Sequence, residues 1–404
     1  MTPAPATARR WPVVAALGVV QIIAWGSSFY LLTVLALPIA RDTGWPLVAV
    51  TGALSAALLV AGLVSPRVGA AVARRGGRPV LAMGCATLAV GLLAIAAAPS
   101  LPIFVLGWLI MGLGMGASLY DPAFATLGRL YGRDARRAIT ALTLWGGFAS
   151  TVSWPLSAAL LEAVGWRGTA AAYAGGHLLV ALPLVLLAIP PAAPRGEGEG
   201  GPPSPSPGAA PALDARERAS FRLFAAMLVI AGVASVVLSV HLLTFLRAQG
   251  HALAAAVALG ALFGPAQVGA RVLEMASGGR HHPILTLGAA AVSTALGLVL
   301  LALDAALPGL ALILFGAGSG LLSIARGALP LAVFGPERYA VLMGRLARPN
   351  LLAQAVAPAL GAAAIARLGP GPTLWALAGL GFANLALLAL LWRRVGGPRG
   401  LEPM

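Results

Sequence analysis

The chain has 404 residues, of which 59% are hydrophobic and 10% are charged. Soluble proteins carry about 25% charged residues, so the composition predicts an integral membrane protein and argues against soluble catalysis. In a soluble protein the net charge of +15 would suggest nucleic acid. Here arginines cluster in short loops between apolar runs, which is typical of membrane topology instead. The single cysteine, Cys85, excludes an internal disulfide and a cysteine metal site.

A helix needs about 20 apolar residues to cross a bilayer. About twelve apolar runs of this length follow one another along the chain, near 12–39, 47–72, 79–98, 102–130, 137–163, 168–189, 221–247, 252–276, 283–303, 308–334, 338–366 and 371–392. The first run is too long for a cleaved signal peptide, so we expect an uncleaved first span. The sequence therefore predicts an all-α membrane bundle.

A polar segment separates the sixth and seventh runs. Residues 190–220 are rich in Pro, Gly, Ser and charge, and are too poor in apolar residues to fold alone. We expect a cytoplasmic linker there, between a six-helix half at 1–189 and a second at 221–404.

The two halves repeat one another. Arg67 and Arg271, Pro79 and Pro283, and Gly84 and Gly288 are each 204 positions apart, and the same offset relates Gly112, Gly114 and Gly116 to Gly316, Gly318 and Gly320. Internal repeats are common in membrane transporters. The sequence therefore predicts two pseudo-symmetric halves.

Arginine placement predicts the orientation of the spans. Most arginines fall in alternate loops on the side of the termini and the linker, whereas Arg41, Arg167, Arg247 and Arg367 fall on the other side. By the positive-inside rule, both termini are expected in the cytoplasm of a multi-pass protein of the cell (inner) membrane.

The first span carries a polar and aromatic face. Gln21, Trp25 and Ser28 recur at helical spacing and Tyr30 follows them. This face is expected to line a cavity that binds substrate. An interhelical hydrogen bond is the alternative explanation.

The loop after the second span reads Gly69-x-x-x-Ala73-Arg74-x-Gly76-Gly77-Arg78. It resembles the loop signature of the major facilitator superfamily, G-x-x-x-D-R-x-G-R-[RK]. The resemblance covers nearly the whole chain and implies secondary transport. Ala73 stands where the family has Asp, and Gly77 where it has Arg. These differences put the charge interactions that are usual at this loop in doubt. Arg74 and Arg78 remain candidates for gating residues; the alternative is that they only fix the orientation of the spans in the membrane.

Asp121 lies in the inner half of the fourth span. A carboxylate at that depth needs a partner or a proton, and we expect Arg67 or Arg74 to supply the charge. We favour a gating role for Asp121 over a role as substrate ligand.

The stretch Tyr131-Gly132-Arg133-Asp134-Ala135-Arg136-Arg137-Ala138 resembles the pattern that leads into the fifth span of monocarboxylate and oxalate/formate-type transporters. Gly44-Trp45, before the second span, fits the same branch.

In the eighth span, Gln267-x-x-x-Arg271 resembles the D-x-x-x-R pair of monocarboxylate transporters. The resemblance implies that Arg271 binds a substrate carboxylate and that the residue four positions earlier takes up and releases the coupled proton. Gln267 cannot titrate, so Glu274, one turn further along, is the expected substitute. The alternative is an Arg271–Glu274 pair that neutralises itself and extends toward the inner surface.

Four other residues are expected to line the substrate cavity. His241 lies in the seventh span at the repeat position of Tyr30, Arg326 lies beside the repeat position of Asp121, and Asn350 and Gln354 share one face of the eleventh span.

The sequence thus predicts a secondary transporter that moves a small organic anion, with a carboxylate preferred and proton coupling expected. We expect a monomer in the lipid bilayer, with no enzymatic activity, cofactor, metal or nucleic-acid partner. One alternative is a proton-driven exporter of amphipathic or cationic drugs, which would use Asp121 or Glu274. Another is a membrane sensor or assembly partner that transports nothing.

Overall fold

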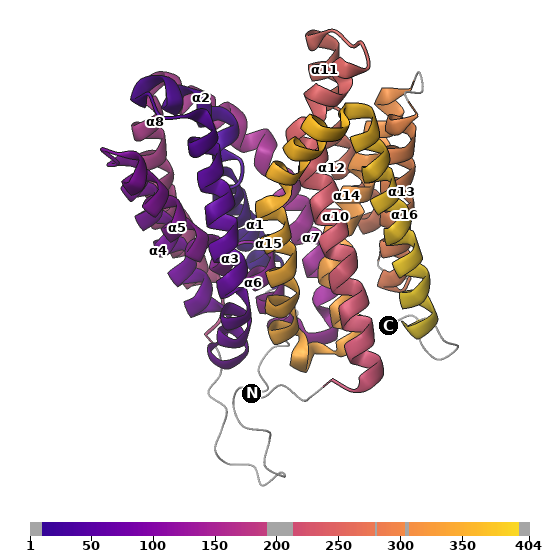
Figure 1. The fold of residues 1–404 in the computed structure, drawn as a ribbon. Coiled ribbons are helices and arrows are strands. Elements are labelled where there is room, and N and C mark those ends of the chain that lie inside the picture. Colours follow the sequence, from indigo (N-terminus) through magenta and orange to yellow (C-terminus); the bar gives the residue numbers. More distant parts are fainter. Residues whose placement is uncertain (1–9, 192–212, 279–280, 304–306, 396–404) are drawn as a thin grey trace. The chain divides into compact units, whose positions relative to one another are not determined.

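The computed structural model describes residues 10–191, 213–278, 281–303 and 307–395. These residues form helices joined by turns, with no strand among them. The α-helices (Figure 1) are α1 Arg10–Ser27, α2 Leu31–Thr43, α3 Leu47–Arg75, α4 Gly77–Ala96, α5 Leu101–Ser118, α6 Tyr120–Tyr131, α7 Ala135–Gly147, α8 Ala149–Gly176, α9 Leu182–Ala188, α10 Ala215–Ala248, α11 Leu253–Gly260, α12 Phe263–Ala276, α13 Pro283–Ala302, α14 Pro308–Phe334, α15 Pro336–Leu368 and α16 Pro370–Val395.

The helices agree with the spans that the sequence predicts. Among the described residues, ten helical stretches are long and apolar enough to cross a membrane. One of them, Leu101–Ala188, has 88 residues, several times the length needed for a hydrocarbon core of about 30 Å. Gly132 and Gly165 take positive φ values of 55° and 68° and divide it into three helical parts. The all-α membrane fold is therefore confirmed, and the helices are compatible with about twelve spans.

The chain forms two compact units. Unit 1 consists of Met1–Ala212 together with Phe334–Arg348, and unit 2 of Leu213–Val333 together with Pro349–Met404. Helix α15 is thus shared, and the division falls at Pro349 inside the helix. Proline removes a backbone hydrogen bond there and permits a bend.

Glycines allow close helix packing in equivalent places of each unit. A Cβ added at Gly112 of α5 would lie 2.4 Å from the Ala57 carbonyl oxygen of α3. A Cβ added at Gly316 of α14 would lie 2.8 Å from the Phe263 carbonyl oxygen of α12. The other glycines related by 204 positions make matching contacts: Gly116 and Gly320 with α3 and α12, and Gly114 and Gly318 with α4 and α13. The repeat in the sequence is therefore a repeat of packing.

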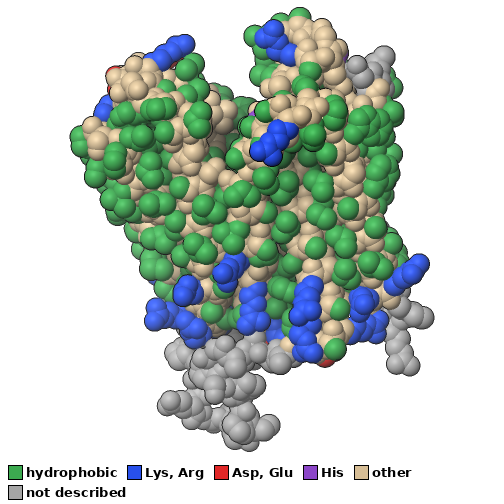
Figure 2. All heavy atoms as spheres, viewed as in Figure 1, with side chains coloured by type: hydrophobic (Ala, Val, Ile, Leu, Met, Phe, Trp, Pro, Cys, Tyr) green, Lys and Arg blue, Asp and Glu red, His purple; other side chains and the backbone are tan. Residues whose placement is uncertain are grey.

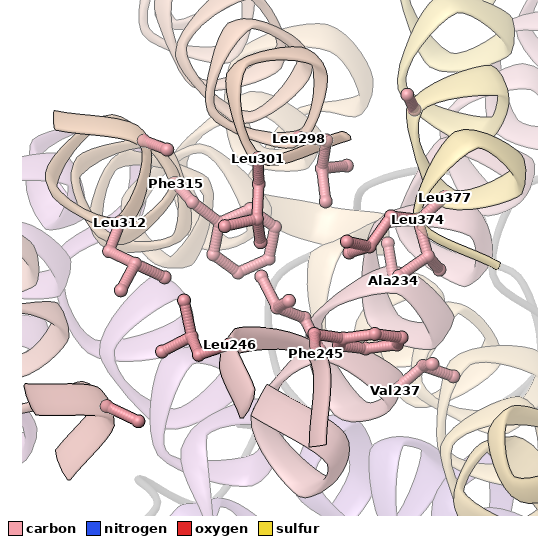
Figure 3. Close-up of a cluster of buried hydrophobic side chains, with 14 of the residues drawn as sticks. Ala234, Val237, Phe245, Leu246, Leu298, Leu301, Leu312, Phe315, Leu374 and Leu377 are labelled. Carbon is pink, nitrogen blue, oxygen red and sulfur yellow. The ribbon is translucent and has the colours of Figure 1, made fainter. Parts of the chain in front are cut away.

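Each unit has an apolar interior. Figure 3 shows the cluster of unit 2, in which side chains of α10, α13, α14 and α16 meet, Phe245 and Phe315 among them. In each unit, Figure 2 shows hydrophobic side chains along the helices and arginine side chains near the helix ends. This distribution suits a lipid environment.

Helix α10 begins earlier than the sequence predicts. Asp214 accepts a hydrogen bond from the Glu217 backbone N–H at 2.7 Å, and the Glu217 carboxylate accepts one from the Asp214 N–H at 3.0 Å. This reciprocal capping box starts the helix at Ala215. The end of the expected linker, near residue 220, is therefore wrong by about one and a half helical turns, while most of the linker lies outside the described residues.

Candidate functional site

Arg271 of α12 is buried, with 5% of its surface exposed. Its Nε donates to Ser323 Oγ at 3.1 Å and to the Gly320 carbonyl oxygen at 3.4 Å, and its Nη2 donates to Gln267 Oε1 at 3.3 Å. These three acceptors are neutral groups that orient the guanidinium group. The side chain therefore lies against α14 inside unit 2, and it does not extend to the surface as the alternative had it.

Arg326 of α14 belongs to a second polar network in unit 2. With the Asn350 amide in the orientation that satisfies its neighbours, its oxygen accepts from Arg326 Nη1 at 3.3 Å and from Gln354 Nε2 at 2.9 Å. The Asn350 side-chain nitrogen donates to the Leu228 carbonyl oxygen of α10 at 2.9 Å. The structure thus brings together three residues that the sequence placed on two separate helix faces.

Close packing supports this second network from α10. A Cβ added at Gly232 would lie 2.4 Å from one terminal atom of the Asn350 amide and 3.2 Å from Gln354 Nε2. Because any larger residue at position 232 would collide with the amides, the glycine allows α10 and α15 to hold them in place.

Glu274 forms a third network, at the end of α12. Its Oε1 accepts from Thr286 Oγ1 of α13 at 2.8 Å and lies 3.2 Å from His281 Nε2. The carboxylate side chain is 9% exposed. The sequence missed both partners. His281 lies in a loop outside the predicted spans, and no periodic pattern links Thr286 to Glu274.

His241 of α10 contacts α15. Its Nε2 lies 3.1 Å from the Pro358 carbonyl oxygen, and a Cβ added at Gly361 would lie 2.9 Å from the same nitrogen. These contacts place His241 where α10 and α15 pack closely against each other. A substrate role for His241 stays a prediction.

In unit 1, the Gln21 side chain is fully buried. Its Nε2 donates to the Ser118 carbonyl oxygen of α5 at 2.7 Å, and its Oε1 accepts from Trp25 Nε1 at 3.1 Å. The Tyr30 ring lies 6.2 Å from the Trp25 ring between centroids. The interhelical hydrogen bond that was the alternative explanation is thus present, and it holds Trp25 in place.

Asp121 lies in the first turn of α6. A small cavity beside it, also in unit 1, is lined by Ser65, Val68, Gly69, Gly116, Pro122, Ala340 and Gly344. Arg67 and Arg74 are exposed and Arg78 is half-buried. The pairing of Asp121 with Arg67 or Arg74 stays a prediction.

Tyr120 belongs to the same aromatic surroundings, although the sequence pattern did not single it out. Its ring lies 5.2 Å from that of Trp25 and stacks on Phe124 at 5.1 Å. The available signal was its position directly before Asp121-Pro122, where α6 begins.

Comparison with known proteins agrees with this architecture. The human monocarboxylate transporter 11 is 32% identical over 213 residues, which cover 50% of this chain and 41% of that protein. The match thus spans less than half the length of this curated relative.

Solved structures show the same fold. The human organic anion transporter MFSD10 (TETRAN) superposes with a TM-score of 0.68 and 17% identity, covering 94% of this chain and 99% of that one. The proton:xylose symporter XylE superposes with a TM-score of 0.71 and 12% identity, covering 96% of each chain. The transporter FucP, in its outward conformation, gives a TM-score of 0.69 and 12% identity, covering 94% of this chain and 98% of that one.

The family model of the Major Facilitator Superfamily matches residues 17–347, which is most of the chain. Together with the helical architecture and its internal repeat, this match shows that the chain belongs to the major facilitator superfamily of membrane transporters.

Proposed function

We propose that this transporter moves a small organic anion, with a carboxylate preferred, across the cell membrane by alternating access. In such a cycle the passenger is exposed to one side of the membrane at a time. The expected location is the cell (inner) membrane with both termini in the cytoplasm, and the expected functional unit is a monomer.

The observation that carries the proposal is the pair of arginines within the helices of unit 2. A charged side chain near the bilayer centre costs roughly 2.5–3.5 kcal/mol even on the lenient insertion scale, so such residues normally serve a function. Guanidinium groups stay charged and donate two parallel hydrogen bonds to a carboxylate. Arg271 and Arg326, each oriented by hydrogen bonds within unit 2, therefore have the chemistry to bind an organic anion.

The name of one similar protein supports the same class of substrate, because that relative is a monocarboxylate transporter. The solved structures share only 12% to 17% identity with this chain and support the fold alone.

We further propose that transport is coupled to protons through Glu274. This carboxyl group is almost buried and bonded to Thr286 and His281. A proton taken up or released there would change both hydrogen bonds, which links protonation to the contact between α12 and α13.

The test is uptake of labelled small carboxylates by purified protein in liposomes. We expect Arg271→Ala to reduce uptake at least tenfold, since removing one partner of a buried charged pair costs about 2–5 kcal/mol. Arg271→Lys should recover part of the activity, because it restores the charge without the planar fork. Arg222→Ala, at an exposed arginine of α10 in the same unit, is the matched control and should behave as wild type.

If Arg271→Ala inserts normally into the membrane and takes up carboxylates at the wild-type rate, Arg271 is not part of the substrate site. Saturable binding with no flux for any carboxylate would favour a membrane sensor. Flux of organic cations that Asp121→Asn abolishes would favour the drug exporter.

A further inference from the structure

Exposed arginines gather in unit 2 where α10 begins and α16 ends. Arg216 lies in the first turn of α10, Arg393 and Arg394 lie in the last turn of α16, and all three side chains are exposed. The two helices pack side by side, and Figure 2 shows arginine side chains at this end of the unit. We call Arg216, Arg393 and Arg394 the arginine cluster.

One contact joins the two helix ends. The Arg216 guanidinium group donates through Nη2 to the backbone carbonyl oxygen of Arg394. The last carbonyl groups of a helix have no partner within the helix, so this bond caps α16 and holds the beginning of α10 beside it. A guanidinium group has several N–H donors, and the other nitrogens of Arg216 can still donate to a ligand. The contact thus concentrates three positive charges at one place.

Acidic residues at this end are few. Asp214 and Glu217, at the beginning of α10, each accept a hydrogen bond from the backbone N–H of the other, so both carboxylates take part in starting the helix. Helix α16 contains no Asp or Glu along its 26 residues. The charge that α16 adds to the cluster is therefore entirely positive.

An apolar stripe of α16 leads to the cluster. Phe382 and Leu390 are 57% and 47% exposed, and they precede Arg393 by eleven and three residues, so the three side chains share one face of the helix. Trp392, beside Arg393, is half-buried, and indole rings favour the level of the lipid headgroups. This face therefore offers apolar contacts along the helix and positive charge at its end.

The arginine at the beginning of unit 1 is placed differently. The Arg10 side chain of α1 is only 13% exposed; it lies 3.8 Å from Asp134 and 5.3 Å from the centre of the Tyr131 ring. Groups of unit 1 itself thus cover this arginine. An arginine that only sets the orientation of a span needs no particular surroundings, whereas the exposed cluster of unit 2 is arranged to receive a ligand.

We propose that the arginine cluster binds the phosphate headgroup of an anionic phospholipid of the cytoplasmic leaflet, with an acyl chain lying along the exposed face of α16. Arginine recognises phosphate through parallel charge-assisted hydrogen bonds. Basic residues just cytoplasmic of a membrane span attract the anionic lipids of that leaflet. The site belongs to unit 2 alone and is independent of the transported substrate, but it uses the orientation that the arginine distribution predicts.

The experiment measures the melting temperature of purified full-length protein in a neutral detergent, because a ligand that binds the folded state raises it. The probes are short-chain phosphatidylglycerol, phosphatidylcholine with the same chains, and inorganic phosphate. We expect phosphatidylglycerol to stabilise the protein saturably, and the other two to have little effect. Added salt should weaken the effect of phosphatidylglycerol, because it screens exposed charges.

Two variants test the cluster itself. Arg393→Gln combined with Arg394→Gln should weaken phosphatidylglycerol binding at least tenfold, because each arginine contributes about fivefold, or ~1 kcal/mol. Arg216→Gln should weaken it about fivefold, and this single change keeps the test available if the double variant does not fold.

Arg222→Gln is the matched control on α10. Arg222 is also exposed, but it follows Arg216 by six residues and therefore lies on a different face of the helix. It should bind phosphatidylglycerol as the wild type does.

Four outcomes would overturn the proposal. Equal stabilisation by phosphatidylcholine would show that the headgroup charge is not recognised, and equal stabilisation by inorganic phosphate would point to a soluble anion instead of a lipid. Unchanged phosphatidylglycerol binding in Arg216→Gln and in a folded double variant would show that the cluster takes no part. A loss in Arg222→Gln as large as that in Arg216→Gln would show a general effect of surface charge.

Discussion

The polar residues inside the helices are organised as small networks that join neighbouring helices. Arg271 donates to Ser323 of α14 and to Gln267 of its own helix, and Arg326 donates to Asn350 of α15. A hydrogen bond to a charged group contributes about 1.5–3 kcal/mol, and several such bonds offset part of the cost of burying a guanidinium. The arginines can therefore remain charged within the bundle, as anion binding requires.

Glu274 provides the sharpest test of proton coupling at the scale of one residue. Glutamine has nearly the same shape and can still accept from Thr286, but it cannot gain or lose a proton. We expect Glu274→Gln to abolish uptake driven by a pH gradient, while exchange of labelled for unlabelled substrate across the membrane continues at a similar rate.

Glu162→Gln, at an exposed glutamate of α8, is the control and should leave both assays unchanged. If Glu274→Gln retains uptake driven by a pH gradient, the coupling residue lies elsewhere.

At the scale of helices, the first part of α15 packs on α3 through two glycines of unit 1. A Cβ added at Gly69 would lie 2.5 Å from the Ala340 carbonyl oxygen and 3.0 Å from Gly344 Cα. A Cβ added at Gly344 would lie 2.4 Å from the Ser65 carbonyl oxygen. Because these neighbours are backbone atoms, the helices would have to separate to admit a methyl group.

We expect Gly69→Ala and Gly344→Ala each to destabilise unit 1 by about 1–3 kcal/mol, the usual penalty of overpacking. The measurement is the melting temperature of the purified protein. The control is Gly52→Ala, also in α3, where an added Cβ would meet nothing within 4 Å.

Gly52→Ala should be neutral or slightly stabilising, because alanine favours a helix by about 1 kcal/mol over glycine. A melting temperature of Gly69→Ala equal to that of Gly52→Ala would contradict the close crossing.

At the scale of the whole molecule, the arginine distribution predicts which loops face the cytoplasm. The end of α3 and the first turn of α4 carry Arg74, Arg75 and Arg78, whereas the turn that begins at Ala97, between α4 and α5, has no arginine. Consecutive spans end on opposite sides of a bilayer, so the two turns should differ in accessibility.

We expect Ala97→Cys to react with a membrane-impermeant maleimide in intact cells, and Arg75→Cys to react only after permeabilisation. Both positions are exposed, so a difference in labelling reports the side of the membrane. The native Cys85 is fully buried, so the background should be low. Labelling of Arg75→Cys in intact cells would reverse the proposed orientation.

Much of the fold could be predicted from the sequence because it depends on local patterns. A bilayer forces each spanning segment to satisfy its own backbone hydrogen bonds, so each apolar run could be predicted to form a helix. The pairing of Gln267 with Arg271 was also predictable, since residues four apart share a helix face. The 204-residue repeat likewise predicted equivalent glycine contacts in each unit.

Contacts between residues that are distant in the sequence could not be predicted from hydropathy, helical periodicity or the internal repeat. Ser323 beneath Arg271, Thr286 beside Glu274, and Tyr120 against Trp25 each join different helices. The sequence likewise did not predict that Phe334–Arg348 groups with unit 1.

By itself, then, the sequence determined that this protein is a duplicated helical membrane transporter and which positions on each helix are polar. Only the tertiary structure decided which of those polar groups meet. The reason is that hydropathy and periodicity act along one helix, whereas the partner of a buried side chain depends on how closely neighbouring helices approach and at what register they cross.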